Sequence, residues 1–221
     1  IQKARLENIE KLEISSVNVK LAAFDEEELS SKWNALDDEG RSQESLRMAI
    51  HAAMVHQVDR NIGRLVVQLN SMGQLDNTLI VFLADNGASS ERARRGDPDP
   101  SAPWGSEMSF ECIGPQWARV ANSPRRGWKG MSYDGGINTC MIAHWPAGIT
   151  KPGTINRDPC HLIDMMPTWM ELAGAKSPAG ASGGSTPKLQ GVSLEPSFHG
   201  KPIDRPTALY FQFGRGRAVL N

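Results

Sequence analysis

An aspartate, an asparagine and a glycine, Asp85-Asn86-Gly87, directly follow a short apolar run over residues 79–84. Carboxylate and carboxamide oxygens are the ligands that hard divalent cations such as Ca²⁺ and Mg²⁺ prefer. In open parallel sheets, ligands bind just beyond the carboxyl ends of the strands, so oxygen ligands at this place suit a metal site. An ordinary turn is the alternative, since all three residue types are favoured in turns. The tripeptide alone leaves both interpretations open.

A lysine, Lys129, lies shortly before a pair of glycines, Gly135-Gly136. Its ammonium group offers a point positive charge and three hydrogen-bond donors to an anionic group. The glycine pair permits a backbone turn that other residues resist. A lone lysine is most often a solvated surface residue, so its charge alone does not assign it a role.

Other polar residues carry weaker signals. His56 and Asp59 are three residues apart on a predicted helix and could face two ligands the same way, but ordinary polar residues on the solvent side of the helix are the preferred explanation. The pair Asp37-Asp38 lies in a polar segment, and we assign it no metal. The cysteines show no CxxC spacing, so neither a disulfide framework nor a zinc site is indicated; they are Cys112, Cys140 and Cys160.

The elements that must position Asp85 and Asn86 are those of an α/β fold. Apolar residues three or four apart over residues 43–72 predict a long helix with a core-facing stripe, with Ser42 as N-cap and Gly73 as its stop. The run over 79–84 predicts a strand buried on both faces, as in a parallel sheet. Residues 137–145 predict a second buried strand. This helix–turn–strand order is the repeating unit of an α/β fold.

The remaining segments connect or follow these elements. A Gly/Pro-rich stretch over residues 88–128 contains six arginines, and we expect an irregular loop that walls a site, with a surface insertion as the alternative. Short helices are predicted over residues 2–11 and from Asp164, as N-cap, to Ala173. Residues 176–190 predict a flexible linker, and residues 208–213 predict a strand.

Composition narrows the class of protein. The positive and negative charges nearly cancel, with 24 Lys and Arg against 25 Asp and Glu, which argues against a nucleic-acid partner. No apolar stretch approaches the length of a membrane span. The chain begins at Ile1 in the middle of a charged, weakly periodic segment, so we expect it to be a piece of a longer protein.

Four segments taken together resemble the downstream half of a bacterial arylsulfatase, in the alkaline-phosphatase-like superfamily. They are MAIHAAMVHQVDRNIGRLVVQLNSMGQLDNTLIVFLADNGAS, SPRRGWKGMSYDGGINTCMIAHWPAGI, HLIDMMPTWMELAGA and LQGVSLEPSFHGK. The resemblance implies an α/β/α sandwich with a mostly parallel sheet, which is incomplete here. Residues 1–175 would then form the downstream part of the catalytic domain, 176–190 the linker, and 191–221 the start of a smaller C-terminal subdomain.

The resemblance also implies roles for individual residues. Asp85 and Asn86 match the family's late Asp-Asn ligands of a bound calcium, which is magnesium in some relatives. Lys129 matches the lysine that binds the sulfate group. Many relatives have His-Glu-Gly-Gly where this chain has Tyr133-Asp134 before its two glycines, so no role is carried over to position 133. Asp164 matches a structural helix start, to which no catalytic role is assigned.

The activity implied is hydrolysis of sulfate monoesters, small-molecule or carbohydrate, by a formylglycine nucleophile in a periplasmic or secreted protein. The family's Cys/Ser-x-Pro-x-Arg nucleophile motif does not occur in these 221 residues. We therefore expect the chain to be inactive alone. Two alternatives remain: a phosphodiesterase or phosphonate hydrolase of the same superfamily, and a non-catalytic remnant of the fold.

Overall fold

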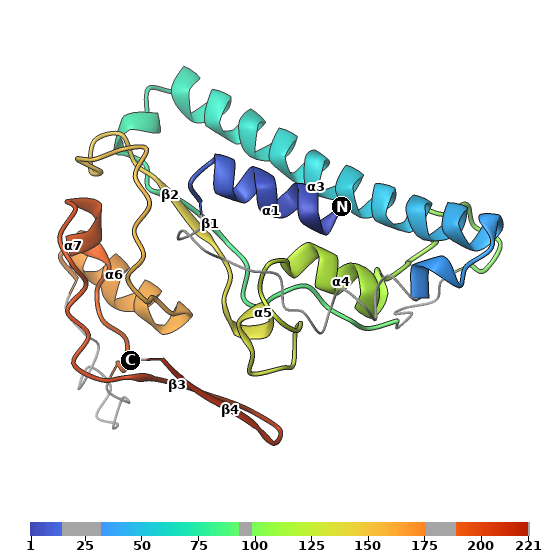
Figure 1. Ribbon diagram of the computed structural model, residues 1–221. Helices are drawn as coiled ribbons and strands as arrows, with labels where there is room; N and C mark the ends of the chain where they lie inside the picture. The colour runs from blue at the N-terminus through green and yellow to red at the C-terminus, as the bar shows by residue number, and fades with distance from the viewer. Residues whose placement is uncertain (15–31, 93–98, 176–188, 221) are drawn as a thin grey trace. The chain divides into compact units, whose positions relative to one another are not determined.

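The structure is a computed structural model that describes residues 1–14, 32–92, 99–175 and 189–220 (Figure 1). Helices and strands are mixed along the chain, and the described residues form two compact units. Unit 1 contains residues 1–68, 84–140 and 212–216, and unit 2 contains residues 69–83, 141–211 and 217–221. No helix among the described residues is both long enough and apolar enough to cross a membrane.

The longest helix is α3, Asp38–Ser71. It begins earlier than predicted, with Asp38 and Glu39 in its first turn. Their negative charges interact favourably with the positive end of the helix dipole. The prediction of Ser42 as N-cap is therefore wrong. The predicted stop is confirmed, because Gly73 follows the helix at a φ of +65° that suits glycine.

The apolar stripe of α3 was expected to face a core, and this expectation is wrong for the described residues. No residue of α3 is buried, and Met54 and Leu65 are 63% and 65% exposed. The first half of the helix is instead held by polar contacts within unit 1. Glu44 accepts a hydrogen bond from the Trp117 indole at 2.9 Å, and Arg47 pairs with Glu111 at 2.6 Å.

Helix α4, Gly114–Asn122, lies inside the segment that was expected to be irregular, so that expectation is wrong for these nine residues. Pro115 stands in its first turn, where proline is tolerated because no intrahelical N–H bond is made there. Trp117 and Ala118 of α4 are buried. They are the buried apolar side chains of the described part of unit 1, so α4 carries the apolar core of this unit.

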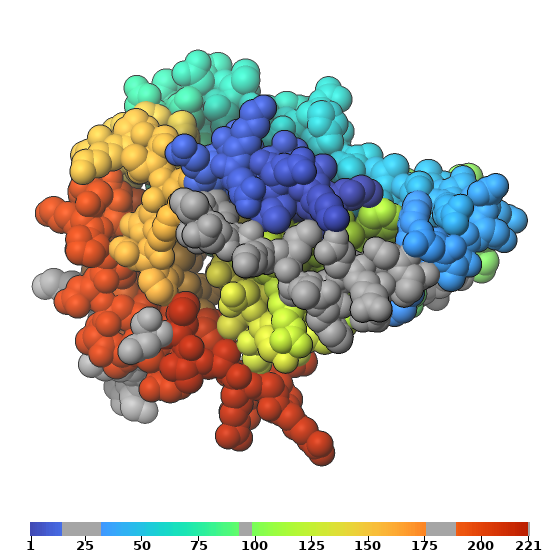
Figure 2. All heavy atoms as spheres, in the orientation of Figure 1, coloured from blue at the N-terminus to red at the C-terminus, as the bar shows by residue number. Residues whose placement is uncertain are grey.

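Helix α1, Gln2–Lys11, has the predicted bounds. Its residues are not buried, and Figure 2 shows its atoms as a dark blue band on the surface. Gln2 donates a hydrogen bond to the Ser123 hydroxyl at 2.9 Å, and Arg5 donates one to the Ser123 carbonyl at 3.0 Å. These bonds attach α1 to the end of α4.

Unit 2 contains the strands β1, Ile80–Leu83, and β2, Met141–His144. They pair antiparallel, with Ile80 opposite His144 and Leu83 opposite Met141, so a parallel arrangement is wrong for this pair. Phe82 is 47% exposed, so β1 is not buried on both faces by the described residues. The short helices η1, Leu75–Asn77, and α5, Asp134–Ile137, precede β1 and β2. The second predicted strand, residues 137–145, is shorter than expected, because α5 ends at Ile137 and β2 begins only at Met141.

Elsewhere in unit 2, α6, Met165–Leu172, follows η2, Leu162–Asp164, and contacts it. Asp164 is the N-cap position as predicted, although its side chain makes no cap bond to α6. Among the described residues of unit 2, four apolar side chains are buried: Met165, Leu194, Phe198 of α7 (Glu195–Phe198) and Leu209 of β3 (Leu209–Phe213).

Strands β3, Leu209–Phe213, and β4, Gly216–Leu220, form a two-stranded sheet near the end of the chain. The strand expected over residues 208–213 is confirmed, whereas β4 was not predicted. Most of the predicted linker, residues 176–188, lies outside the described residues. The predicted domain limits at 175 and 191 stay a prediction, and residues 141–211 belong to one compact unit.

Candidate functional site

The loop that follows β1 in the chain carries the two predicted metal ligands. Asp85 is exposed and Asn86 is half-buried. The Asn86 amide Nδ2 donates to the Gly87 carbonyl at 2.9 Å, which orients the side chain. Among the described residues, neither the Asp85 carboxylate nor the Asn86 Oδ1 has a hydrogen-bond or ionic partner. Three side-chain oxygens of this loop therefore have lone pairs to offer to a ligand.

Backbone hydrogen bonds hold the loop that contains Lys129 against the loop of Asp85 and Asn86. The Lys129 N–H donates to the Ala88 carbonyl at 3.0 Å, and the Gly87 N–H donates to the Gly136 carbonyl at 3.1 Å. On the other side, the Thr139 hydroxyl donates to the Ala84 carbonyl at 2.6 Å. The segment 84–88 is thus held by residues on both sides of the glycine pair. The Lys129 side chain is exposed and has no ionic partner among the described residues.

Glycine at positions 87, 135 and 136 is required by contact between backbones. A Cβ atom on Gly87 would lie 1.7 Å from the Gly135 carbonyl oxygen. A Cβ on Gly135 would lie 2.3 Å from the Gly127 oxygen, and one on Gly136 would lie 2.0 Å from the Met131 oxygen. The sequence predicted a turn at the glycine pair. The structure adds that these glycines let the Asp85-Asn86 loop and the Lys129 loop touch directly.

Asn122, the last residue of α4, was missed by the sequence analysis. Its Oδ1 accepts a hydrogen bond from the Ala88 N–H at 2.9 Å, and its Nδ2 donates to the Gly127 carbonyl at 3.0 Å. One side chain therefore bonds the backbone of both loops. The Gly-Pro start of α4 is the signal that could have placed a helix here, but nothing in the sequence singles out this asparagine.

The end of the stretch over residues 88–128 carries positive charge beside these loops. The Arg126 guanidinium lies over the ring of Tyr133, 4.2 Å from its centroid, and that of Arg119 lies over Trp128 at 4.9 Å. Such stacking holds a cation against an aromatic face. Tyr133, to which the resemblance carried over no role, is thus an aromatic support for Arg126.

The ligand atoms that Asp85 and Asn86 offer are of the type that a divalent cation such as Ca²⁺ or Mg²⁺ binds. Both are oxygen ligands, which Ca²⁺ and Mg²⁺ prefer, and both keep oxygens free of described partners. Ca²⁺ takes about six to eight oxygens, of which these two side chains can supply up to about three. The described residues contain no group of three or more His, Cys, Asp or Glu side chains that could hold a metal. The remaining ligands must therefore be water, substrate or other groups of the protein.

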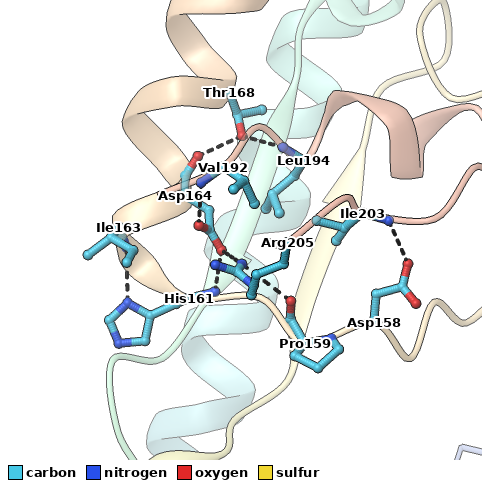
Figure 3. A network of polar contacts seen from close by, with 10 residues as sticks. All are labelled: Asp158, Pro159, His161, Ile163, Asp164, Thr168, Val192, Leu194, Ile203 and Arg205. Atoms are coloured by element: carbon cyan, nitrogen blue, oxygen red, sulfur yellow. Dashed lines mark hydrogen bonds and ion pairs between the residues drawn. The ribbon is translucent and has the colours of Figure 1, made fainter. Parts of the chain in front are cut away.

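Asp164 belongs to a separate network in unit 2, shown in Figure 3. Its fully buried carboxylate accepts hydrogen bonds from the His161 N–H at 2.7 Å and the Val192 N–H at 2.9 Å, and it pairs with Arg205. Thr168 adds a bond from the Leu194 N–H at 2.8 Å. These contacts attach the chain after residue 189 to the start of α6, which agrees with a structural role.

Comparison with known proteins identifies the family of the chain. A sulfatase family model matches residues 24–175, more than half of the chain. The arylsulfatase of Klebsiella aerogenes is 36% identical over 158 residues, covering 66% of this chain and 34% of the relative. An uncharacterized sulfatase of Schizosaccharomyces pombe is 31% identical over 191 residues, covering 80% of this chain and 34% of the relative. The chain thus spans about a third of the length of these two curated relatives.

One solved structure has a similar arrangement of the backbone. The crystal structure of Ps i-CgsB in complex with k-i-k-neocarrahexaose matches with a TM-score of 0.52 and 25% identity. The match covers 88% of this chain and 34% of that one. Because the family model covers most of the chain and both curated relatives exceed 30% identity, the chain belongs to the sulfatase family.

Proposed function

We propose that the protein containing this chain hydrolyses sulfate monoesters, with Asp85 and Asn86 among the ligands of a Ca²⁺ ion and Lys129 in contact with the sulfate group. Mg²⁺ is the second candidate ion. The observation that carries the proposal is the pair of backbone hydrogen bonds, Lys129 to Ala88 and Gly87 to Gly136, at 3.0 and 3.1 Å. They hold two oxygen ligands and one exposed ammonium group on adjoining loops.

This arrangement suits the charge of the substrate. A sulfate ester is an anion, and negative charge shifts toward the leaving oxygen as the S–O bond breaks. A cation held by Asp85 and Asn86 would neutralise that charge, which is the electrostatic stabilisation that enzymes use most. The Lys129 ammonium would bind sulfate oxygens as a point charge, and its exposed position leaves room for the ester.

The nucleophile that the family resemblance implies, a formylglycine, would supply the attack on sulfur. Its Cys/Ser-x-Pro-x-Arg motif does not occur in the 221 residues. Our proposal therefore assigns binding of the metal and of sulfate to this chain, and predicts that the chain alone does not turn over sulfate esters. We also propose that the two units belong to an α/β/α sandwich of the alkaline-phosphatase-like kind.

The substrate class proposed is a small-molecule or carbohydrate sulfate ester. Support comes from the relatives: one is named an arylsulfatase, and the solved neighbour was crystallised with k-i-k-neocarrahexaose. The arginines Arg119 and Arg126, held over aromatic rings beside the candidate site, would favour a substrate with more than one negative charge.

Substitution of the site residues in the full-length protein tests the proposal. Lys129→Ala should lower kcat/KM for p-nitrophenyl sulfate by about 100-fold, the usual cost of removing one charge-stabilising donor. Asp85→Ala should weaken Ca²⁺ binding measured by calorimetry. The matched controls are Lys201→Ala and Asp59→Ala, which remove exposed side chains elsewhere. Unchanged kcat/KM in Lys129→Ala, or unchanged Ca²⁺ affinity in Asp85→Ala, would refute the assignment of that residue.

A further inference from the structure

We propose that Asn122 is a positioning residue that couples the binding of the cation to the binding of sulfate. The inference rests on the proposed function of Asp85, Asn86 and Lys129. In this view the Asn122 amide fixes the spacing between the loop of Asp85-Asn86 and the loop of Lys129. An ion bound to the first loop then holds the second in the geometry that binds sulfate.

The contacts that carry this inference come from one side chain. Oδ1 of Asn122 accepts from the Ala88 N–H at 2.9 Å, only two residues beyond Asn86. Nδ2 donates to the Gly127 carbonyl at 3.0 Å, two residues before Lys129. The other bonds that we described between the two loops join backbone to backbone. Among the described residues, Asn122 is the side chain that bonds both.

The chemistry of the two partners demands a carboxamide. The Ala88 N–H needs an acceptor and the Gly127 carbonyl needs a donor, and the Asn122 amide presents one of each on a single planar group. An aspartate of the same size keeps the acceptor but has no donor when ionised. It would therefore place a negative charge against the Gly127 carbonyl oxygen. Alanine removes both bonds.

The position of Asn122 makes the side chain a fixed reference point. It ends α4, where Trp117 and Ala118 are 7% and 0% exposed and anchor the helix. The Asn122 carbonyl also accepts from the Arg125 N–H at 2.9 Å, which sets the path of the chain toward Gly127. A movement of either loop relative to α4 must stretch one of the two hydrogen bonds made by the Asn122 side chain. Both binding groups are therefore tied to the same rigid helix.

Calorimetry on the full-length protein tests the inference, with CaCl₂ and inorganic sulfate as probes. The dissociation constant of sulfate is measured with and without saturating Ca²⁺, and the ratio is the coupling factor. Couplings between sites are typically about 5- to 150-fold. In the unsubstituted protein Ca²⁺ should tighten sulfate binding by a factor in this range. In Asn122→Ala and Asn122→Asp the factor should fall to about twofold or less.

The control is Asn61→Ala, which removes an exposed asparagine of α3 whose side chain accepts hydrogen bonds from Gln57 and Arg64 of the same helix. It should keep the full coupling factor. Asn122→Asp decides the matter if Asn122→Ala does not fold, because it keeps the size of the side chain and the bond to Ala88. Coupling retained in the folded Asn122 variants would overturn the inference and leave the proposed function standing. If the unsubstituted protein bound no Ca²⁺, or Asp85→Ala bound it equally well, both would be overturned.

Discussion

The sharpest prediction concerns Gly87, because its replacement by alanine changes one methyl group at the contact between the two loops. The new Cβ would lie 1.7 Å from the Gly135 carbonyl oxygen, whereas ordinary contacts begin at 3.4 Å. The loops must therefore separate by about 1.7 Å, the difference between these two distances. The obstructing atom belongs to the backbone, so no change of side-chain rotamer relieves the clash.

The cost follows from the hydrogen bonds that this separation breaks. The bonds at risk are Gly87 N–H to Gly136 at 3.1 Å, Lys129 N–H to Ala88 at 3.0 Å, and Ala88 N–H to Asn122 at 2.9 Å. Each contributes about 1 kcal/mol net, so Gly87→Ala should lower the free energy of unfolding by about 3 kcal/mol. The same separation should weaken sulfate binding, since it displaces Lys129.

Urea unfolding of the full-length protein, followed by circular dichroism, measures this loss. The matched control is Gly63→Ala in α3, where an added Cβ meets nothing within 4 Å. Alanine is favoured over glycine inside helices, so this variant should gain up to about 1 kcal/mol. Equal unfolding midpoints for Gly87→Ala and Gly63→Ala would refute the argument that the loops are held in backbone contact.

Two further predictions concern unit 2. Asp164→Ala leaves the Arg205 guanidinium without its carboxylate, and it should lower the free energy of unfolding in urea by about 3–5 kcal/mol. The control is Asp158→Ala, which removes one hydrogen bond from the Ile203 N–H and should lower it by about 1 kcal/mol. Equal losses in the two variants would contradict the role of the Asp164 network. Cys160 is an exposed residue, but partial burial of its thiol raises the pKa, and the Asp164 carboxylate raises the pKa further while Arg205 opposes the shift. The folded state then holds the thiol proton more tightly, so alkylation of Cys160 by iodoacetamide should need a higher pH than alkylation of an ordinary thiol. The contribution of Cys160 to folding stability is full below the pKa of the unfolded state and is lost as pH rises through the pKa of the folded state. A pH dependence of unfolding that is unchanged in Cys160→Ala would contradict the shift.

Local pattern was sufficient for the elements that carry Asp85 and Asn86. The apolar run that stops at an aspartate identified β1 to within one residue at each end, and the helix over residues 2–11 has its predicted bounds. The direction of strand pairing was not accessible, because it depends on the partner strand and not on the run itself. The burial of α3 was misjudged for the same reason: periodicity marks an apolar face but does not say what covers it.

At the candidate site too, residues that are recognisable by type could be predicted from the sequence, whereas a residue whose role depends on contacts with other segments could not. Asp85, Asn86 and Lys129 stand out by residue type and by family resemblance, and the structure brings their loops together. Asn122 does not stand out, because an asparagine at the end of a short helix is most simply a cap or turn residue. Its importance comes from two backbone groups that lie 34 residues before it and 5 residues after it in the chain.

The Asp164 network has a consequence for how the chain can change length. Its carboxylate bonds the Val192 N–H, 28 residues further along the chain, and so closes a loop that contains residues 176–188. The entropy of closing a loop rises only with the logarithm of its length, at about 0.6 kcal/mol for each doubling. With both ends anchored at one carboxylate, insertions between residues 176 and 188 should cost little stability. The contacts around Asp164 should therefore keep α6 and the chain after residue 189 in register when the length of the chain between them changes.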